Sequence, residues 1–188
     1  MKRALDLALV LLAAPLWLPM FAFVALAVLA FEGRPVFFRQ ARSGRDGEPF
    51  GLVKFRSMKN GAESDAERLT RFGRLLRASS LDELPELLHV LSGRMSLVGP
   101  RPMPVRYLPR YSEKQRRRLE VRPGITGWAQ IHGRNLCSWE DKFNYDVWYV
   151  DHVSTALDLK ILFLTMLTVF TARGISAENE ATMTEFMG

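Results

Sequence analysis

The chain has 188 residues, 48% of them hydrophobic, a formal net charge of +6, one cysteine (Cys137) and three scattered histidines that match no zinc-binding spacing. These values allow one packed domain, or one domain with an anchor, and they exclude an internal disulfide and argue against a zinc site. The excess of basic residues indicates an anionic partner: nucleic acid, a phosphate-bearing substrate or a membrane surface.

The first predicted element is an apolar segment, residues 4–31, whose only charged residue is Asp6. A straight helix of this length would measure about 42 Å, which exceeds the roughly 30 Å hydrocarbon core of a bilayer. Pro15 and Pro19 lie near its middle, and each removes a backbone hydrogen bond. Basic residues flank both ends, as expected for a segment that enters and leaves a membrane by the same face. We predict a re-entrant membrane hairpin over residues 1–33, with a single kinked span as the alternative.

Two strand-like segments follow, PVFFRQ (35–40) and FGLVKFRSM (50–58), separated by the turn-forming residues SGRDGEP. They predict a β-hairpin. Because side chains alternate across a strand, Lys54 and Arg56 are expected on one face. This pair could bind phosphate or belong to an ordinary solvated face.

Several further segments are predicted to be helical or highly charged. Residues 68–77 place arginines at every third position beside an apolar stripe, which predicts a basic amphipathic helix at lipid headgroups or on the core. The charged run 113–122 is predicted to be a solvated or lipid-facing surface. The aromatic segment 143–154 predicts a core or interface helix, and 161–172 is too short to span a membrane and predicts a core or interfacial helix.

The stretch SSLDELPELLHVL, residues 79–91, places two adjacent carboxylates, Asp82 and Glu83, at the head of an apolar helical run. Ser80 and Glu83 have the spacing of a capping box, and acidic residues suit the positive end of a helix dipole. The leucines at helical spacing predict one buried face. By itself this stretch favours an ordinary helix start over a reactive site.

Two stiff or glycine-rich connectors complete the pattern. Arg101 lies between Pro100 and Pro102, which restrict the backbone, and a guanidinium on a stiff loop suits a phosphate, a carboxylate or a plain salt bridge. Residues 122–135 predict a glycine-punctuated loop that allows close approach to a ligand, although they match no nucleotide-binding motif.

In this order, these segments resemble one family, the monotopic bacterial phosphoglycosyl transferases. The resemblance runs the whole length and is carried by GRPVFFRQARSG, KFRSM, RFGRLLRASSLDELPELLHVLSGRMSLVGPRP, VRPGITGWAQIHGRN, WEDKFNYDVWYV and LDLKI. The tail GISAENEATMTEF is most similar to the bacillosamine-type subgroup. The resemblance implies an α+β fold that is mainly helical with a small β-hairpin, a proline-broken re-entrant helix and interfacial amphipathic helices. Residues 34–188 would then be a catalytic domain on the cytoplasmic face of the bacterial inner membrane.

The family's reaction moves a sugar-1-phosphate from a UDP-sugar to a polyprenyl (undecaprenyl) phosphate and releases UMP. By resemblance, Asp82 is the nucleophile that forms an aspartyl-phosphosugar intermediate and Glu83 is its partner, with Mg²⁺ held at Asp82 and Glu83. For Glu83, metal binding and positioning of the nucleophile are both open. The resemblance predicts three cations at the phosphate site, Lys54, Arg77 and Arg101. Arg56 is added to them because of its position on the same strand as Lys54. The tail favours an N-acetylated amino sugar donor such as UDP-N,N'-diacetylbacillosamine, and UDP-galactose or UDP-glucose is the alternative.

One departure from the family concerns the break in the membrane segment. The family often has a Ser-Pro pair there, whose hydroxyl can satisfy a carbonyl freed by the kink. Here Ala14 precedes Pro15, so that hydrogen bond is unavailable, and Pro19 is expected to supply a second break.

The expected partners are a UDP-sugar, a polyprenyl phosphate and membrane phospholipids. Nucleic acid is not expected, because no recognised nucleic-acid motif is present and the arginines lie beside an apolar stripe. A non-enzymatic basic membrane scaffold is the rival interpretation, and the sequence predicts no oligomeric state.

Overall fold

The computed structural model describes the whole chain except residues 60, 62–63, 133–136 and 172–184. Its helices are α1 (Lys2–Leu12), α2 (Ala14–Phe31), α3 (Asp65–Arg68), α4 (Arg71–Ala78), α5 (Glu86–Ser92), α6 (Glu113–Arg116), α7 (Trp128–His132), α8 (Trp139–Asp151) and α9 (Thr155–Thr171). Its strands are β1 (Phe37–Ser43), β2 (Pro49–Phe55), β3 (Ser96–Val98) and β4 (Gly124–Thr126). The predicted α+β class is confirmed.

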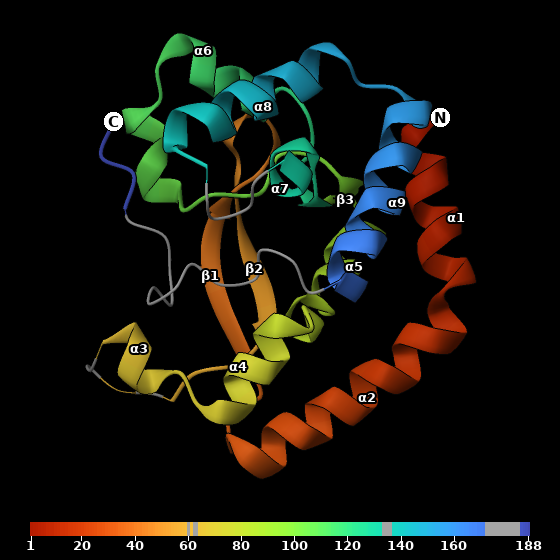
Figure 1. Cartoon of the computed structure of the whole chain (residues 1–188), viewed down its shortest axis with the longest axis vertical. Coiled ribbons are helices and arrows are strands. Elements are labelled where there is room, and N and C mark those ends of the chain that lie inside the picture. The colour runs from red at the N-terminus through yellow and green to blue at the C-terminus, as the bar shows by residue number, and fades with distance from the viewer. Residues whose placement is uncertain (60, 62–63, 133–136, 172–184) are drawn as a thin grey trace.

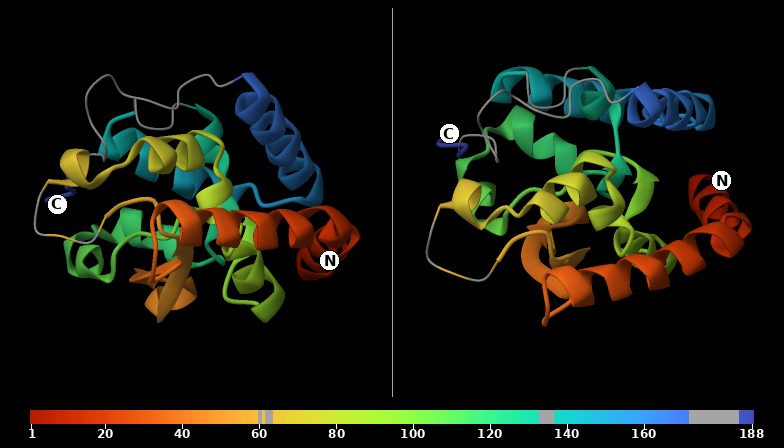
Figure 2. Two further views of the ribbon diagram at one scale, coloured as in Figure 1. Left: turned by 90° about the horizontal axis from the view of Figure 1, so that it is seen from below. Right: turned by 60° about the horizontal axis from the view of Figure 1, so that its bottom comes forward.

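The β1–β2 hairpin lies at the centre of the molecule, with α6 and α8 beyond one end and α2 and α4 beyond the other (Figure 1). It is antiparallel, with Phe37 opposite Phe55 and Ser43 opposite Pro49, as the sequence predicts. In Figure 2, α2 and α4 lie close together, and a core cluster that includes Val28, Phe55 and Leu76 joins them to β2. The hairpin therefore packs against α2 and α4 at one of its ends.

The N-terminal segment is two helices joined at an elbow at Ala13, where α1 ends and α2 begins in a different direction (Figure 1). Pro15 lies in the first turn of α2, where a missing N–H is tolerated. Pro19 lies inside α2, and the helix continues through it, so the expected second break at Pro19 is wrong. A single proline removes only one bond of the helix ladder, and the residues after it restore the pattern.

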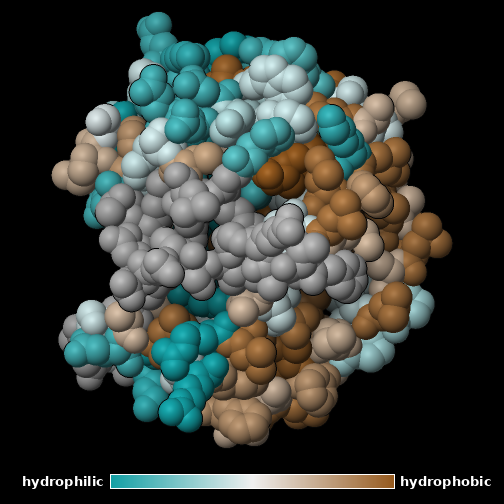
Figure 3. Space-filling model, in the orientation of Figure 1, coloured by the Kyte–Doolittle hydropathy of each residue, from teal (hydrophilic) through white to brown (hydrophobic). Residues whose placement is uncertain are grey.

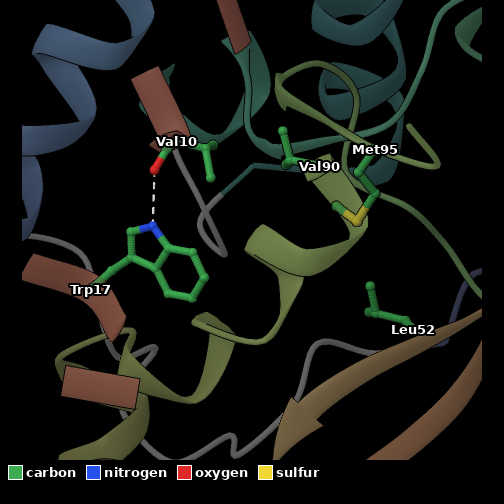
Figure 4. Packing of buried hydrophobic residues seen from close by; sticks show 5 residues of the cluster. All are labelled: Val10, Trp17, Leu52, Val90 and Met95. Atoms are coloured by element: carbon green, nitrogen blue, oxygen red, sulfur yellow. Dashed lines mark hydrogen bonds between the residues drawn. The ribbon is translucent and has the colours of Figure 1, made fainter. Parts of the chain in front are cut away.

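The bond that Ala14 cannot supply at the elbow is replaced by a tryptophan. The indole N–H of Trp17 donates to the carbonyl of Val10 at 2.9 Å, across the break between the helices (Figure 4). The carbonyls of the last helical turn have no partner within their own helix, and an unsatisfied one is costly when buried. Trp17 also packs with Val10, Leu52 and Val90 in one core cluster, so the elbow is held by both polar and apolar contacts.

Substitution of Trp17 by phenylalanine tests this hydrogen bond. The ring remains apolar, but the buried carbonyl of Val10 loses its donor, so we expect a loss of about 1–3 kcal/mol in the free energy of unfolding. Thermal unfolding in detergent would measure it. Trp148→Phe is the matched control, because Trp148 is partly exposed. Equal effects of the two substitutions would contradict the role of the Trp17 bond.

Polar residues of α1 attach this helix to the body of the protein. Lys2 Nζ lies 2.6 Å from Asp158 Oδ2 on α9, and the hydroxyl of Ser96 on β3 donates to Asp6 Oδ2 at 2.8 Å. Arg3 donates to the carbonyl of Leu91 at the end of α5 at 2.9 Å. The only charge in the apolar segment, Asp6, is thus buried against the body of the protein.

One side of the protein exposes large apolar side chains. Helix α2 is long and apolar enough to cross a membrane, and only 17% of its residues are buried inside the protein. Figure 3 shows apolar residues gathered over the side occupied by α1, α2 and α9. The exposed residues on α2 and α9 include Leu16, Leu18, Phe23, Leu26, Phe31, Leu159, Phe163 and Met166. These helices form the face that suits a lipid environment.

Three local predictions need correction. The helix predicted over 68–77 begins only at Arg71, because the Thr70 hydroxyl caps it by accepting from the Gly73 N–H at 2.8 Å. The loop predicted over 122–135 contains β4, which pairs in parallel with β3, and then α7; residues 133–135 lie outside the described part of the chain. Its glycines serve backbone packing: a Cβ on Gly124 would lie 2.1 Å from a backbone nitrogen. The run 113–122 is not wholly solvated, because Arg118 is buried.

Candidate active site

The two adjacent carboxylates lie in a tight connection between α4 and α5. Ser80 has a left-handed backbone (φ 57°), and a short 3-10 helix, η2 (Leu81–Glu83), follows it. Ser80 makes no side-chain cap bond, so the predicted capping box is wrong. An N-cap residue needs an extended backbone, and Ser80 cannot have one because it reverses the chain directly after α4. Helix α5 begins only after Pro85, at Glu86.

The face that this segment buries also differs from the leucine stripe. Pro85, Glu86, His89 and Val90 are buried, whereas Leu88 is 47% exposed. The imidazole Nε2 of His89 accepts a hydrogen bond from the Val53 N–H at 3.1 Å, which ties α5 to β2. The helix therefore presents its polar residues to the strand that carries Lys54.

Cations from two other elements contact these carboxylates. Lys54 Nζ lies 2.6 Å from Glu83 Oε1 and 3.2 Å from Glu86 Oε1. The Arg101 guanidinium donates to the same Glu83 oxygen. Asp82 is buried, yet it forms no hydrogen bond or ion pair within the described part of the chain. The result is one carboxylate, Glu83, that is bound to cations, beside another, Asp82, that has no described hydrogen-bond or ion-pair partner.

The electrostatics separate the two neighbours. Burial and the adjacent Glu83 raise the pKa of Asp82 to about 6, against the attraction of Lys54, Arg101 and Arg77. Burial opposes the ionisation of Glu83 as well, but Arg101 and Lys54 more than offset it and hold the pKa of Glu83 well below its ordinary value. Burial and Glu83 therefore oppose the ionisation of Asp82, and the nearby cations favour it.

The structure brings three of the four predicted phosphate-site cations to the carboxylates. Lys54 and Arg101 contact Glu83, and Arg77, whose Nε donates to the Ser57 hydroxyl at 3.0 Å, acts on Asp82 through its charge. Arg56 is placed elsewhere. Strand β2 ends at Phe55, and the buried Arg56 guanidinium donates to the carbonyl of Glu32 at the end of α2. The alternation that grouped Arg56 with Lys54 does not hold beyond the strand's end.

Glu86 is a member of this cluster that sequence reasoning missed. Its side chain is only 2% exposed and shares Lys54 with Glu83. Burial and the charge of Glu83 raise the pKa of Glu86 to about 7, although Lys54 and Arg101 favour its ionised form. A signal was available, because Glu86 lies three residues after Glu83 and follows a proline, in a position where helical spacing brings both side chains to one face.

We expect Glu86→Gln to change how stability depends on pH. A carboxyl whose pKa is raised by folding binds its proton more tightly in the folded protein. Its stabilising contribution is therefore complete below the ordinary value of 4.5 and is lost as the pH rises through about 7. As the pH rises from about 5 to about 8, the melting temperature of the wild type should therefore decrease relative to that of the variant. The exposed Glu140→Gln control should follow the wild type, and a parallel pH dependence in wild type and Glu86→Gln would contradict the prediction.

Asp82 and Glu83 both have carboxylate oxygens available to bind a magnesium ion. Both described contacts of Glu83 are made through Oε1, and Asp82 has no described partner, so oxygens of each remain for a metal. Within the described ranges, no group of three or more His, Cys, Asp and Glu side chains could hold a metal. Mg²⁺ is commonly bound by one or two carboxylates together with substrate phosphates, and the pair suits that arrangement.

A buried carboxylate without a described partner therefore lies among three cations, on a body that exposes apolar side chains on one side. The sequence profile of the bacterial sugar transferase family matches residues 1–172. The chain belongs to the bacterial sugar transferase family.

Three curated relatives illustrate the similarity. The uncharacterized sugar transferase EpsL of Bacillus subtilis is 57% identical over an alignment of 162 positions that covers 83% of this chain and 80% of EpsL. The UDP-glucose:undecaprenyl-phosphate glucose-1-phosphate transferase of Escherichia coli is 41% identical, over 90% of this chain and 40% of the relative. The UDP-N-acetylgalactosamine-undecaprenyl-phosphate N-acetylgalactosaminephosphotransferase of Aeromonas hydrophila is 34% identical, over 92% of this chain and 44% of the relative. The chain thus spans less than half the length of the last two.

Proposed function

We propose that this protein is a phosphoglycosyl transferase that moves a sugar-1-phosphate from a UDP-sugar to undecaprenyl phosphate. The observation that carries the proposal is the free, buried carboxylate of Asp82, next to Glu83 and surrounded by the charges of Lys54, Arg77 and Arg101. Membership of the family and relatives named for this transfer support it.

The first step forms a covalent intermediate on Asp82. A carboxylate oxygen attacks the phosphorus that bears the sugar, the bond from this phosphorus to the bridging oxygen breaks, and UMP leaves with that oxygen. The product on the protein is an acyl phosphate, an aspartyl-phosphosugar. Lys54, Arg77 and Arg101 offset negative charge on the transferring group and on the departing UMP.

The second step regenerates the carboxylate. A phosphate oxygen of undecaprenyl phosphate attacks the same phosphorus, the bond to Asp82 breaks, and undecaprenyl-diphosphate-sugar is released. Asp82 and Glu83 would hold Mg²⁺, which when bound supplies positive charge to the phosphates. Glu83, engaged by Lys54 and Arg101, fixes these cations beside the reacting carboxylate.

The membrane face gives the site access to both substrates. We place the body on the cytoplasmic face of the bacterial inner membrane, with the segment over residues 1–33 re-entering by the side from which it came. The elbow at Ala13 and the exposed apolar residues of α2 support this arrangement. Cysteines introduced at positions 2 and 45 should then react from the same side of the membrane, and reaction from opposite sides would indicate a span.

The donor proposed from the tail, residues 174–186, is an N-acetylated amino sugar such as UDP-N,N'-diacetylbacillosamine; most of this tail, residues 174–184, lies outside the described part of the chain. A plain hexose donor is the second candidate, because relatives such as the Escherichia coli protein are named for UDP-glucose. Bacillosamine-type specificity rests on the tail alone.

The test is UMP release from a panel of UDP-sugars in detergent with Mg²⁺, with and without undecaprenyl phosphate. We expect one donor to give a single turnover of UMP without acceptor and continued turnover with it, because the intermediate forms before the lipid reacts. If UMP appears only after the acceptor is added, the covalent route is excluded. If no donor releases UMP under either condition, the proposed activity is excluded for those donors.

A further inference from the structure

The loop that carries Arg101 is held through its carbonyl groups. Residues 100, 102 and 104 are prolines, so the loop has few N–H groups with which to stabilise itself. Four consecutive carbonyls instead accept hydrogen bonds from outside the loop. The carbonyl of Pro100 accepts from Gly124 N at 3.0 Å, and that of Arg101 accepts from Arg118 Nη2 at 2.7 Å. The carbonyl of Pro102 accepts from Arg42 Nη1 at 3.2 Å, and that of Met103 accepts from Ser43 N at 2.9 Å.

The donor to the Arg101 carbonyl is a buried charge. Arg118 is 2% exposed, and its Nε and Nη2 donate to Asp146 Oδ2 on α8 at 2.9 and 2.8 Å. Its Nη1 donates to the Tyr111 hydroxyl at 3.2 Å. The planar guanidinium therefore bridges α8 to the main chain of the Arg101 loop, a geometry that the single ammonium of lysine cannot reproduce.

Aromatic rings enclose this bridge. The Arg118 guanidinium lies over the rings of Tyr111 and Phe143, at 5.8 and 5.6 Å from their centroids. Phe186, near the C-terminus, packs on Phe143 with ring centroids 5.0 Å apart. Exclusion of water makes the polar contacts of Arg118 stiffer, but a buried ion pair by itself adds little to stability compared with apolar residues. Apolar residues in place of Arg118 and Asp146 could fill the same space, but they could not donate a hydrogen bond to the Arg101 carbonyl.

We propose that Arg118, held by Asp146, is a positioning residue for sugar-phosphate transfer: it fixes the main chain of Arg101 and so directs the Arg101 guanidinium to Glu83 and the transferring phosphate. This role rests on the proposed function. Arg118 itself touches neither Glu83 nor Asp82 in the described contacts, so it acts through Arg101.

Arg118→Lys tests the proposal, and Arg117→Lys is its matched control. Arg117 is the neighbouring residue and also pairs with an aspartate of α8, Asp151, but its side chain is 42% exposed and has no described contact with the Arg101 loop. We expect kcat/KM to fall by about 10-fold or more in Arg118→Lys, because a small misplacement of a charged group strongly reduces the rate. Arg117→Lys should match the wild type.

A double-mutant cycle separates positioning from a general structural effect. In an Arg101→Ala background, Arg118→Lys should cause little further loss, because no guanidinium remains to be directed. An equal loss in both backgrounds, or a wild-type rate in Arg118→Lys, would overturn the proposal. If Arg118→Lys does not fold, Asp146→Asn takes its place in the same cycle, since it keeps the shape of the pair and removes one charge.

A readout without catalysis keeps this proposal distinct from the proposed function. In the wild type, the effects of Arg101→Ala and Glu83→Gln on thermal unfolding should be strongly non-additive, because the two side chains contact each other. In the Arg118→Lys background, the effects of these two substitutions should become nearly additive. If no UDP-sugar is turned over in the UMP-release experiment, the proposed function fails. If the non-additivity on thermal unfolding is unchanged in the Arg118→Lys background, the positioning role of Arg118 is refuted, whatever the outcome for the proposed function.

Discussion

Asp82→Asn should reduce sugar-phosphate transfer by about 10³-fold or more, because an amide cannot serve as the attacking carboxylate. The variant should unfold at the same temperature as the wild type or a higher one. Burial and Glu83 raise the pKa of Asp82 to about 6, which shows that its charge is held at a cost in the folded protein. Measured on the same preparation, UMP release should therefore fall while the unfolding temperature stays the same or rises.

Asp46→Asn is the matched control for this substitution. Asp46 lies in the turn of the β-hairpin, its side chain is 69% exposed, and its left-handed backbone (φ 55°) is one that asparagine tolerates. It should retain wild-type turnover. Continued turnover by Asp82→Asn would instead make Asp82 a structural residue of the α4–α5 connection and would exclude the covalent intermediate proposed here.

Gly73→Ala should cost about 3 kcal/mol in the free energy of unfolding and also reduce transfer. Helix propensity alone would favour alanine by about 1 kcal/mol. Here, however, a Cβ would lie 1.8 Å from the carbonyl oxygen of Ser57, a backbone atom that cannot move aside cheaply. Helix α4 must shift away from the end of β2. Arg77, one helical turn after Gly73 and bonded to the Ser57 hydroxyl, would shift with it and lose its place near Asp82.

Gly51→Ala in β2 is the corresponding control, because a Cβ there would meet no atom within 4 Å. It should change the free energy of unfolding by no more than about 0.5 kcal/mol and leave transfer unchanged. Thermal unfolding in detergent and UMP release measure both variants. If Gly73→Ala were as stable as Gly51→Ala, the close approach of α4 to Ser57 would not be needed for the fold.

Local patterns in the sequence predicted the elements well where neighbours along the chain decide the structure. Alternating β-formers around a turn cluster predicted the hairpin of β1 and β2, and the apolar run over residues 4–31 predicted a segment apolar enough for a membrane, as helix α2 is. Local patterns failed where the next element interferes. Ser80 has the spacing of a cap residue, but the chain reversal after α4 forces it into a left-handed backbone.

The sequence by itself also determined that Asp82 and Glu83 are adjacent, and the resemblance selected Lys54, Arg77 and Arg101 as their partners. Only the tertiary structure decided that Arg56 holds the end of α2, that Glu86 joins the carboxylates, and that Arg118 is buried while its neighbour Arg117 is exposed. The physical reason is that turn and strand preferences act between residues close in sequence. Burial of a charge depends instead on whether partners from distant elements, such as Asp146 on α8, satisfy it once the chain has packed.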